Sequence, residues 1–199
     1  MKAQEKLLER SLSMDNGASS YRRFRDNGDV HGLDEIIIEY SDGLILYLTS
    51  IVGKIQTAEE LAEDTFVLLG TKKPKYKEKS SFKTWLYAIG RNIAIDHIRK
   101  YSRKSCISIE DTPEMIDDET AVEEAYIKKE QQIIIHKAMR KLQPRYQQVL
   151  WLIYFEGFSN KEAAKIMKKS LRSLESMLYR ARKSLRSQLE TEGFEYVET

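Results

Sequence analysis

The chain has 199 residues, of which 41% are hydrophobic and 32% are charged. No apolar run approaches the roughly 20 residues of a membrane-spanning helix, and the N-terminal residues lack the apolar core of a signal peptide. We therefore expect a cytoplasmic protein without membrane insertion. The single cysteine excludes an internal disulfide and a cysteine-rich zinc site, and the three histidines lie far apart in the sequence. We expect neither a metal site nor any other cofactor.

Charge is unevenly distributed along the chain, although the formal net charge is only +2. Residues 72–104 contain 11 basic and 2 acidic side chains, and residues 137–190 contain 13 basic and 4 acidic ones. Between them, residues 107–127 contain 8 acidic side chains and no basic one. Because Lys and Arg clusters bind phosphates by counterion release, the two basic blocks predict two contacts with nucleic acid. The acidic stretch includes Pro113 and few large apolar residues, so we expect a mobile linker there.

With only three prolines and nine glycines, and little β-branched alternation, the sequence predicts an all-α protein of two small domains. Apolar residues at helical spacing start at Leu33 and predict a helix of about five turns that ends near Gly53. A second helix is expected from Ala58 to Leu69, ended at Gly70. Its outer face is acidic and consists of Glu59, Glu60, Glu63 and Asp64.

A lysine-rich loop is expected over residues 71–81, because Pro74 and the lack of apolar periodicity argue against helix. A third helix follows in residues 81–104. Its apolar positions are expected to point inward, namely Phe82, Leu86, Ile89 and Ile93. Basic and aromatic residues interleave at this junction, as on surfaces that bind unstacked single-stranded bases. Each of these rings can instead simply pack in the core. For any one of Phe82, Trp85 and Tyr87, core packing is the favoured interpretation.

The C-terminal basic block contains the pattern of a helix-turn-helix in residues 158–182. The expected inward positions of its two helices are Ala163, Ala164, Ile166 and Met167, then Leu171, Leu174, Leu178 and Ala181. Ser170 suits the N-cap of the second helix, since its hydroxyl oxygen can accept a free backbone N–H. The alternative interpretation is a surface helical hairpin with solvated charges.

Three segments together resemble the extracytoplasmic-function (ECF) type of sigma factor, a sigma-70 family component of bacterial RNA polymerase. They are AEELAEDTFVLL (58–69), SFKTWLYAIGRNIAIDHIRK (81–100) and GFSNKEAAKIMKKSLRSLESMLYRAR (157–182). The resemblance implies a factor that directs core polymerase to promoters and helps to melt them. The implied parts are an N-terminal extension (1–20), a sigma region 2-like domain (21–104), the acidic linker (105–124), a region 4-like helix-turn-helix domain (125–190) and a tail (191–199).

For the first domain, the resemblance implies docking on the β′ clamp helices of core polymerase through Glu59, Glu60, Glu63 and Asp64. This chain has Thr57 and Glu63 where the family usually has Asp and Gln. The resemblance also implies contacts with the melted minus 10 element from Lys77, Lys79, Ser80, Trp85, Arg91, Asn92, Arg99, Lys100 and Arg103. In the family a flipped base is held near the position of Asn92, whose amide suits a base edge. The alternative is that this amide caps a neighbouring backbone group.

For the second domain, the resemblance implies contacts with the minus 35 duplex from Asn160, Lys161, Arg172, Ser173, Glu175, Ser176, Tyr179, Arg180 and Lys183. The β flap of core polymerase and an anti-sigma factor are further implied partners. Glu175 and Met177 stand where relatives often have basic residues. Glu175 cannot pair with guanine acceptors, but it can accept from a cytosine amino group or orient a neighbouring arginine. Because it also repels phosphate, we expect weak DNA binding by this domain alone, aided by attachment to polymerase.

Two other functions remain open from the sequence. A free-standing helix-turn-helix repressor or activator needs a dimer interface and a palindromic operator, and a protein-binding helical adaptor leaves both basic blocks unexplained. The linker is either a simple tether or, as the resemblance implies, a segment that threads toward the polymerase active-site cleft. The sequence has no phosphate-cradling glycine loop, nucleophile motif or metal cluster, so we expect no enzymatic activity.

Overall fold

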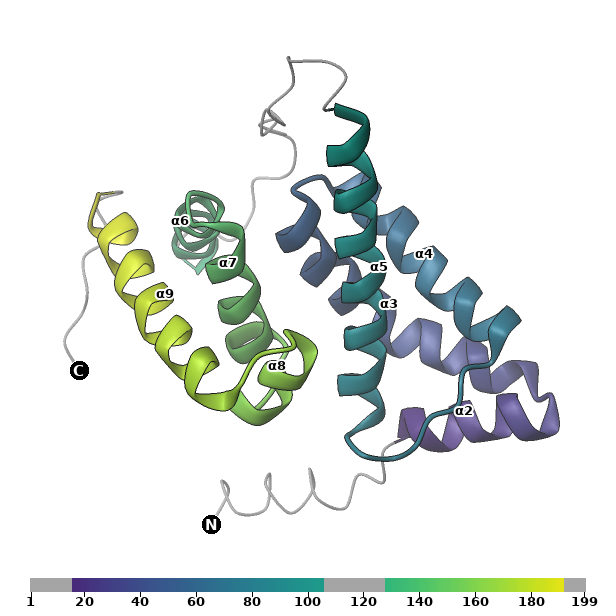
Figure 1. Ribbon diagram of the computed structural model, residues 1–199. Helices are drawn as coiled ribbons and strands as arrows, with labels where there is room; N and C mark the ends of the chain where they lie inside the picture. The colour runs from purple at the N-terminus through teal and green to yellow at the C-terminus, as the bar shows by residue number, and fades with distance from the viewer. Residues whose placement is uncertain (1–15, 106–127, 192–199) are drawn as a thin grey trace, which may run out of the picture.

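The computed structural model describes residues 16–105 and 128–191. All regular elements in these ranges are helices, and they form two helical domains that lie side by side (Figure 1). The all-α prediction is therefore confirmed. The expected acidic linker and most of the C-terminal tail lie outside the described residues. Within the described ranges, no helix combines the length and the apolar character needed to cross a bilayer.

The described part of the first domain has four helices. They are α2 (Asn16–Asn27), α3 (Val30–Val52), α4 (Ile55–Lys72) and α5 (Phe82–Ser105). The side chain of Asp29 caps the start of α3 by accepting a hydrogen bond from the His31 backbone N–H. Gly53 ends α3 in the left-handed region, with φ of 79°, and its N–H donates to the Thr49 carbonyl oxygen. The helix end predicted at Gly53 is confirmed.

The end of α4 differs from the sequence-based expectation. Gly70 lies inside the helix, which continues to Lys72, and Lys73 then forms the C-cap with φ of 44°. The cause is Pro74, because a proline disfavours helical backbone in the residue before it. Glycine by itself costs a helix only about 1 kcal/mol, so Gly70 does not stop α4.

α2 was not predicted from the sequence, and the expected domain boundary at residue 21 falls inside this helix. Tyr21 and Phe24 anchor α2 in the core, with 1% and 6% of their surface exposed. The helix lies very close to α3 because Gly32 has no side chain. A Cβ atom at Gly32 would collide with the carbonyl oxygen of Ser20.

Phe82, at the start of α5, is the centre of the first core and is completely buried. Four rings surround it at centroid distances of 5.4 to 5.8 Å, those of Tyr21, Tyr40, Tyr76 and Trp85. Tyr87 is also fully buried, whereas Ile89 and Ile93 are only half-buried. Core packing therefore accounts for Phe82 and Tyr87.

The second domain consists of short helices and one long C-terminal helix. They are α6 (Lys128–Arg140), α7 (Pro144–Leu150), the π-helical turn η1 (Trp151–Phe155), α8 (Asn160–Ile166) and α9 (Leu171–Thr191). α8 and α9 form the predicted helix-turn-helix, and Ser170 caps α9 by accepting a hydrogen bond of 3.2 Å from the Ser173 N–H. A second cap was not predicted. Ser159 and Glu162 form a reciprocal capping box at the start of α8.

Candidate polymerase and nucleic-acid interfaces

An acidic strip covers the outer face of α4. It consists of the exposed residues Glu59, Glu60, Glu63 and Asp64. The opposite face of the helix is buried in the core through Leu61, Ala62 and Phe66. Val67 lies one turn beyond Glu63 on the outer face and is 58% exposed. In the part of the chain that the structure describes, no basic side chain pairs with these carboxylates. The strip therefore suits a basic partner.

The lysine-rich loop between α4 and α5 is held to the core by two tyrosine hydroxyls. Tyr21 donates to the Pro74 carbonyl oxygen over 2.7 Å, and Tyr76 donates to the Ser80 carbonyl oxygen. Burial raises the pKa of the Tyr21 hydroxyl to about 12, so it remains a hydrogen-bond donor even at alkaline pH. The fixed backbone presents exposed lysine side chains, namely Lys75, Lys77 and Lys79.

α5 exposes the predicted minus 10 residues to different degrees. Arg99 and Lys100 are exposed, whereas Trp85 and Asn92 are half-buried. The Asn92 amide forms no hydrogen bond with any residue in the described ranges, so it caps none of their backbone groups. Arg103 lies within α5, but its side chain is outside the described part of the structure.

Arg91, which the resemblance implies as a minus 10 contact, points partly inward. It is half-buried, and its Nε has no hydrogen-bond partner among the described residues. Burial raises the pKa of the Tyr47 hydroxyl, and the nearby positive charge of Arg91 opposes this rise. Arg91 lies one turn after the buried Tyr87, on the side of α5 that faces the core. Position along the helix therefore explains its partly inward orientation.

α9 presents a polar, largely basic face to solvent. The predicted minus 35 residues on this helix are all exposed, namely Arg172, Ser173, Glu175, Ser176, Tyr179, Arg180 and Lys183. The buried stripe of α9 consists of Leu174, Met177, Leu178 and Ala181. Leu171, expected inside, is 37% exposed because this stripe starts one turn later. At the start of α8, Lys161 is exposed and Asn160 is half-buried.

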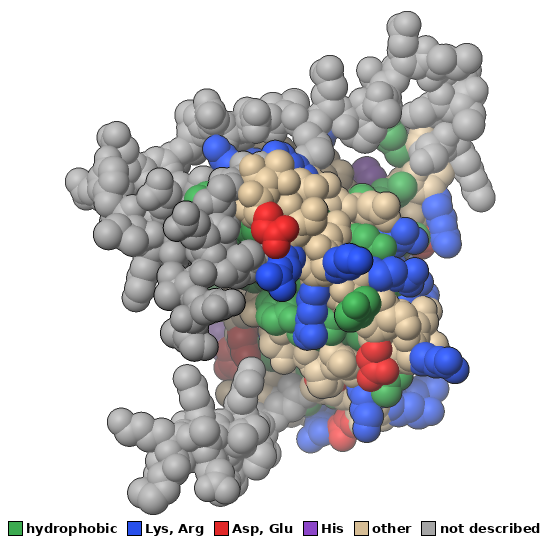
Figure 2. Space-filling model, turned by 90° about the vertical axis from the view of Figure 1, so that its left-hand side faces the viewer, with side chains coloured by type: hydrophobic (Ala, Val, Ile, Leu, Met, Phe, Trp, Pro, Cys, Tyr) green, Lys and Arg blue, Asp and Glu red, His purple; other side chains and the backbone are tan. Residues whose placement is uncertain are grey.

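The face of the molecule on the side of α9 is rich in positive charge. Figure 2 shows Lys and Arg side chains spread over this face, with few acidic side chains among them. Phosphate-rich ligands are attracted to such surfaces. The distribution agrees with the second nucleic-acid contact predicted from the sequence.

The two domains touch in two places, where α8 meets α5 and where α7 and η1 meet α3. The Glu156 carboxylate, directly after η1, accepts a hydrogen bond of 2.6 Å from the Tyr87 hydroxyl. It also pairs with the Lys83 ammonium group over 2.9 Å. Glu156 was not predicted from the sequence, because no local pattern connects it with Tyr87 and Lys83, which lie so far away in the chain.

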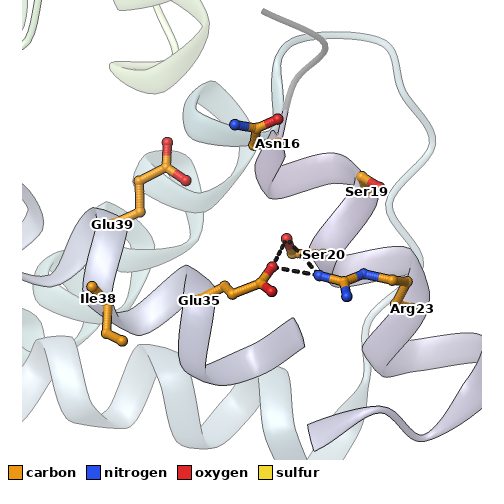
Figure 3. Close-up of a pocket in the computed structure, with 7 residues that line it drawn as sticks. All are labelled: Asn16, Ser19, Ser20, Arg23, Glu35, Ile38 and Glu39. Carbon is orange, nitrogen blue, oxygen red and sulfur yellow. Dashed lines mark hydrogen bonds and ion pairs between the residues drawn. The ribbon is translucent and has the colours of Figure 1, made fainter. Parts of the chain in front are cut away.

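A shallow pocket of about 420 Å³ lies between α2 and α3 (Figure 3). Its lining residues are Asn16, Ser19, Ser20, Arg23, Glu35, Ile38 and Glu39. The Glu35 carboxylate accepts hydrogen bonds of 2.5 Å from Arg23 and from Ser20, and these hold its pKa below the usual value. The polar cluster joins the two helices. Among residues 16–105 and 128–191, no three His, Cys, Asp or Glu side chains are grouped to hold a metal ion.

Two family models match the chain, in the order of its domains. Sigma-70 region 2 matches residues 36–104, and Sigma-70, region 4 matches residues 132–185. The chain is 29% identical over 155 residues to the ECF RNA polymerase sigma factor SigM of Bacillus subtilis (strain 168), covering 78% of this chain and 93% of that relative. It is 25% identical over 170 residues to SigW of the same organism, covering 81% of this chain and 91% of SigW.

Two solved structures are similar in fold. The sigma factor RpoE in complex with the anti-sigma factor NepR, from Bartonella quintana, matches with a TM-score of 0.61 at 24% identity, covering 79% of this chain and 96% of that one. CnrH in complex with the cytosolic domain of CnrY matches with a TM-score of 0.59 at 18% identity, covering 88% and 96%. These matches agree with the arrangement of the helices.

Proposed function

This chain belongs to the sigma-70 family as an ECF-type RNA polymerase sigma factor, and we propose that it reads two promoter elements with two separate surfaces. As a sigma factor it binds core RNA polymerase and promoter DNA and supports transcription initiation. Sigma factors are not enzymes, and we propose that this one performs no covalent chemistry and acts in the cytoplasm. An anti-sigma factor is a further proposed partner.

The presence of both a region 2 match and a region 4 match in one helical chain carries this proposal. A free-standing repressor needs only the helix-turn-helix and leaves the exposed α4 strip and the lysine-rich loop without a role. We propose that the first domain comprises residues 16–105, which includes α2, and the second comprises residues 128–191. These ranges lie close to the expected boundaries.

The direct test is a runoff transcription assay with purified core polymerase on genomic fragments. We expect promoter-specific transcripts that require this chain. The matched control is core polymerase alone on the same fragments. Sequence-specific DNA binding by this chain with no dependence of initiation on it would instead identify a repressor or activator.

We propose that the loop between α4 and α5, together with α5 itself, holds the melted minus 10 strand. The support is the combination of exposed lysines on a fixed backbone, the half-buried Trp85 ring and the Asn92 amide without a described protein partner. Aromatic rings bind unstacked bases, and lysines bind the phosphates between them. Arg99 and Lys100 extend the positive surface along the helix.

Replacing Asn92 with alanine should selectively reduce open complexes. The substitution removes roughly 1 to 3 kcal/mol of base-edge interaction and leaves the buried residues of α5 unchanged. Polymerase binding and closed complexes should persist. Permanganate footprinting on a duplex promoter and on one mismatched across the minus 10 region measures the effect, and the mismatched template should restore most of the lost initiation.

The control for this experiment is Asn27→Ala, at an exposed position at the end of α2. It should leave footprints on both templates unchanged. Equal losses on both templates for Asn92→Ala, or a lower melting temperature that accounts for them, would assign Asn92 a structural role.

We propose that α9 is the helix that enters the major groove at the minus 35 element. Replacing Arg180 with alanine should weaken binding to all DNA sequences. It should also reduce the slope of the logarithm of affinity against the logarithm of salt concentration by about one, if its guanidinium contacts phosphate. DNA binding at several salt concentrations measures the Arg180 effect, with Arg186→Ala in the last turns of α9 as the charge-matched control.

Glu175→Lys should change the preferred minus 35 sequences and raise the affinity for non-specific DNA. Transcription from a randomised minus 35 library measures the Glu175 effect. Identical library use by wild type and the Glu175 variant would exclude base readout by Glu175.

A further inference from the structure

We propose that residues 1–15 dock on the exposed face of α3 as an amphipathic helix. The docking surface, which we call the α3 ridge, consists of Glu39, Asp42 and Leu46. Two basic side chains of the segment pair with the two carboxylates of the ridge. The contact lies within one chain and needs neither polymerase nor DNA, so it goes beyond the proposed function.

The α3 ridge combines negative charge with an exposed apolar side chain. Glu39 and Asp42 are exposed, and Leu46 keeps 45% of its surface exposed. The three residues lie at three- and four-residue steps, so they share one face of the helix. In the parts of the chain that the structure describes, no Lys or Arg pairs with Glu39 or Asp42. Glu35, one turn before Glu39, differs because its carboxylate is already paired with Arg23 of α2.

The segment joins the described chain beside this ridge. Asn16 is the first residue of α2, and it lines the same pocket of about 420 Å³ as Glu39 (Figure 3). Residue 15 is therefore attached at the edge of the ridge. Because the segment and the ridge belong to one chain, the effective concentration of the segment is high and weak contacts suffice to dock it.

The antiparallel arrangement of α2 and α3 sets the direction of the segment. The Ser20 hydroxyl donates to the Glu35 carboxylate. A Cβ atom at Gly17, three residues earlier on α2, would collide with Tyr40, five residues further along α3. Going backward along the chain from the start of α2 therefore leads toward the C-terminal half of α3, where Leu46 lies.

The length of the segment is sufficient for the ridge. Fifteen residues in a helix extend about 22 Å, whereas the distance along α3 from Glu39 to Leu46 is about 10 Å. Several residues next to Asn16 can therefore form a turn, and the remaining helix still covers the ridge.

The sequence of residues 1–15 supplies the complementary side chains. Lys6 and Arg10 are four residues apart, so they share one face of a helix, and Leu7 lies next to this face. Glu5 and Glu9 each precede a basic residue and lie about 100° around the helix from it. The segment therefore presents a face that is basic and apolar without being acidic.

The spacing of the charges matches across the contact. Lys6 and Arg10 are about 6 Å apart along a helix axis, and Glu39 and Asp42 are about 4.5 Å apart. Long, flexible side chains bridge this difference. In the antiparallel direction Arg10 lies nearer to Glu39, and Lys6 lies nearer to Asp42. Leu7 then packs on the side of the ridge that carries Leu46.

Paramagnetic broadening of backbone amide signals in the full chain tests the contact. A nitroxide is attached at Gln4→Cys in a Cys106→Ser background, so the basic and apolar residues of the segment are unchanged. The signals of residues 39–46 should lose most of their intensity, and chemical reduction of the nitroxide should restore it. Raising the salt concentration should weaken the broadening, because exposed ion pairs are screened.

Charge reversal on either side should release the segment. Lys6→Glu with Arg10→Glu should shift the ratio of docked to released molecules by roughly 10-fold, because both ion pairs become repulsive. Glu39→Lys with Asp42→Lys should have the same effect. The four substitutions together restore the ion pairs with inverted sign and should restore the broadening. Unchanged circular dichroism shows that the first domain remains folded in each variant.

The matched control is Glu59→Lys with Glu60→Lys on the α4 strip. It makes the same change in net charge as the ridge variant, at exposed positions of the same domain, and should leave the broadening of residues 39–46 unchanged. Broadening of residues 59–67 in place of residues 39–46 would show that the segment docks on the α4 strip, and it would overturn the proposal.

A mixing experiment separates docking within one chain from binding to a second copy. Isotope-labelled chain without nitroxide is combined with unlabelled chain that carries it, and the labelled signals should stay unbroadened. Broadening in the mixture would identify a second copy as the occupant and overturn the proposal. The absence of broadening at residues 39–46 in the singly labelled chain would also overturn it, as would full broadening after charge reversal of Glu39 and Asp42.

Discussion

Replacing Phe82 with alanine should lower the free energy of unfolding of the first domain by about 3 to 5 kcal/mol. The ring is completely buried and contacts rings from α2, α3, the lysine-rich loop and α5 itself. Removing it leaves a cavity at the point where these elements meet. Since domains of this size are stable by only about 5 to 15 kcal/mol, the variant should populate unfolded forms and lose polymerase binding.

Urea unfolding followed by tryptophan fluorescence measures this loss, and the two tryptophans report on different domains. Trp85 lies in the first core beside Phe82, and Trp151 lies in η1 of the second domain. Variants that keep only one tryptophan separate the two transitions. Ile38→Ala, at a side chain that is 82% exposed, is the control and should change stability by less than about 0.5 kcal/mol. An equally stable Phe82→Ala variant would contradict the described core.

Reversing charge on the α4 strip should weaken binding to core polymerase by roughly 100-fold, given the coupling energies of close charge pairs across interfaces. The triple variant Glu59→Lys, Glu60→Lys and Glu63→Lys changes only exposed side chains, so the helix should remain folded. The loss should diminish at high salt, where charges are screened. Fluorescence anisotropy of the labelled chain titrated with core polymerase measures the affinity.

The matched control reverses three exposed acidic residues of α3 in the same domain, Asp34, Glu39 and Asp42. It produces the same net charge and should retain most of the affinity. Equal losses in the two triple variants would show that net charge alone governs binding. Full affinity of the α4 variant, with helical circular dichroism intact, would place the docking surface elsewhere.

Local patterns predicted those parts of the fold that depend on local physics. Gly53 ends α3 because it adopts a left-handed backbone, and Ser170 caps α9 through its own hydroxyl. Two nearby residues, Gly70 and Pro74, could each end α4, and the helix ends just before Pro74 and not at Gly70. α2 was missed because its sequence is mostly polar and its stability comes from long-range contacts such as that between Tyr21 and Phe82.

In the candidate surfaces, too, some features follow from local sequence patterns and others depend on contacts between distant residues. The exposed face of α9 and the α4 strip follow from helical periodicity, because one face of each helix is apolar. Arg91 lies one turn after the buried Tyr87, so its partly inward position also follows from helical periodicity. The contact of Glu156 with Lys83 depends on how the two domains pack against each other. The spacing of residues within either segment does not predict it.

The backbone of the lysine-rich loop is held in place without the help of its lysine side chains. Tyr21 and Tyr76 hold the loop through main-chain carbonyl oxygens, and a carbonyl is present whatever side chain a residue carries. Exchanging Lys77 or Lys79 for other residues should therefore weaken phosphate binding without reshaping the path of the backbone. A loop built in this way can change its charge by single substitutions while the path of its backbone is kept.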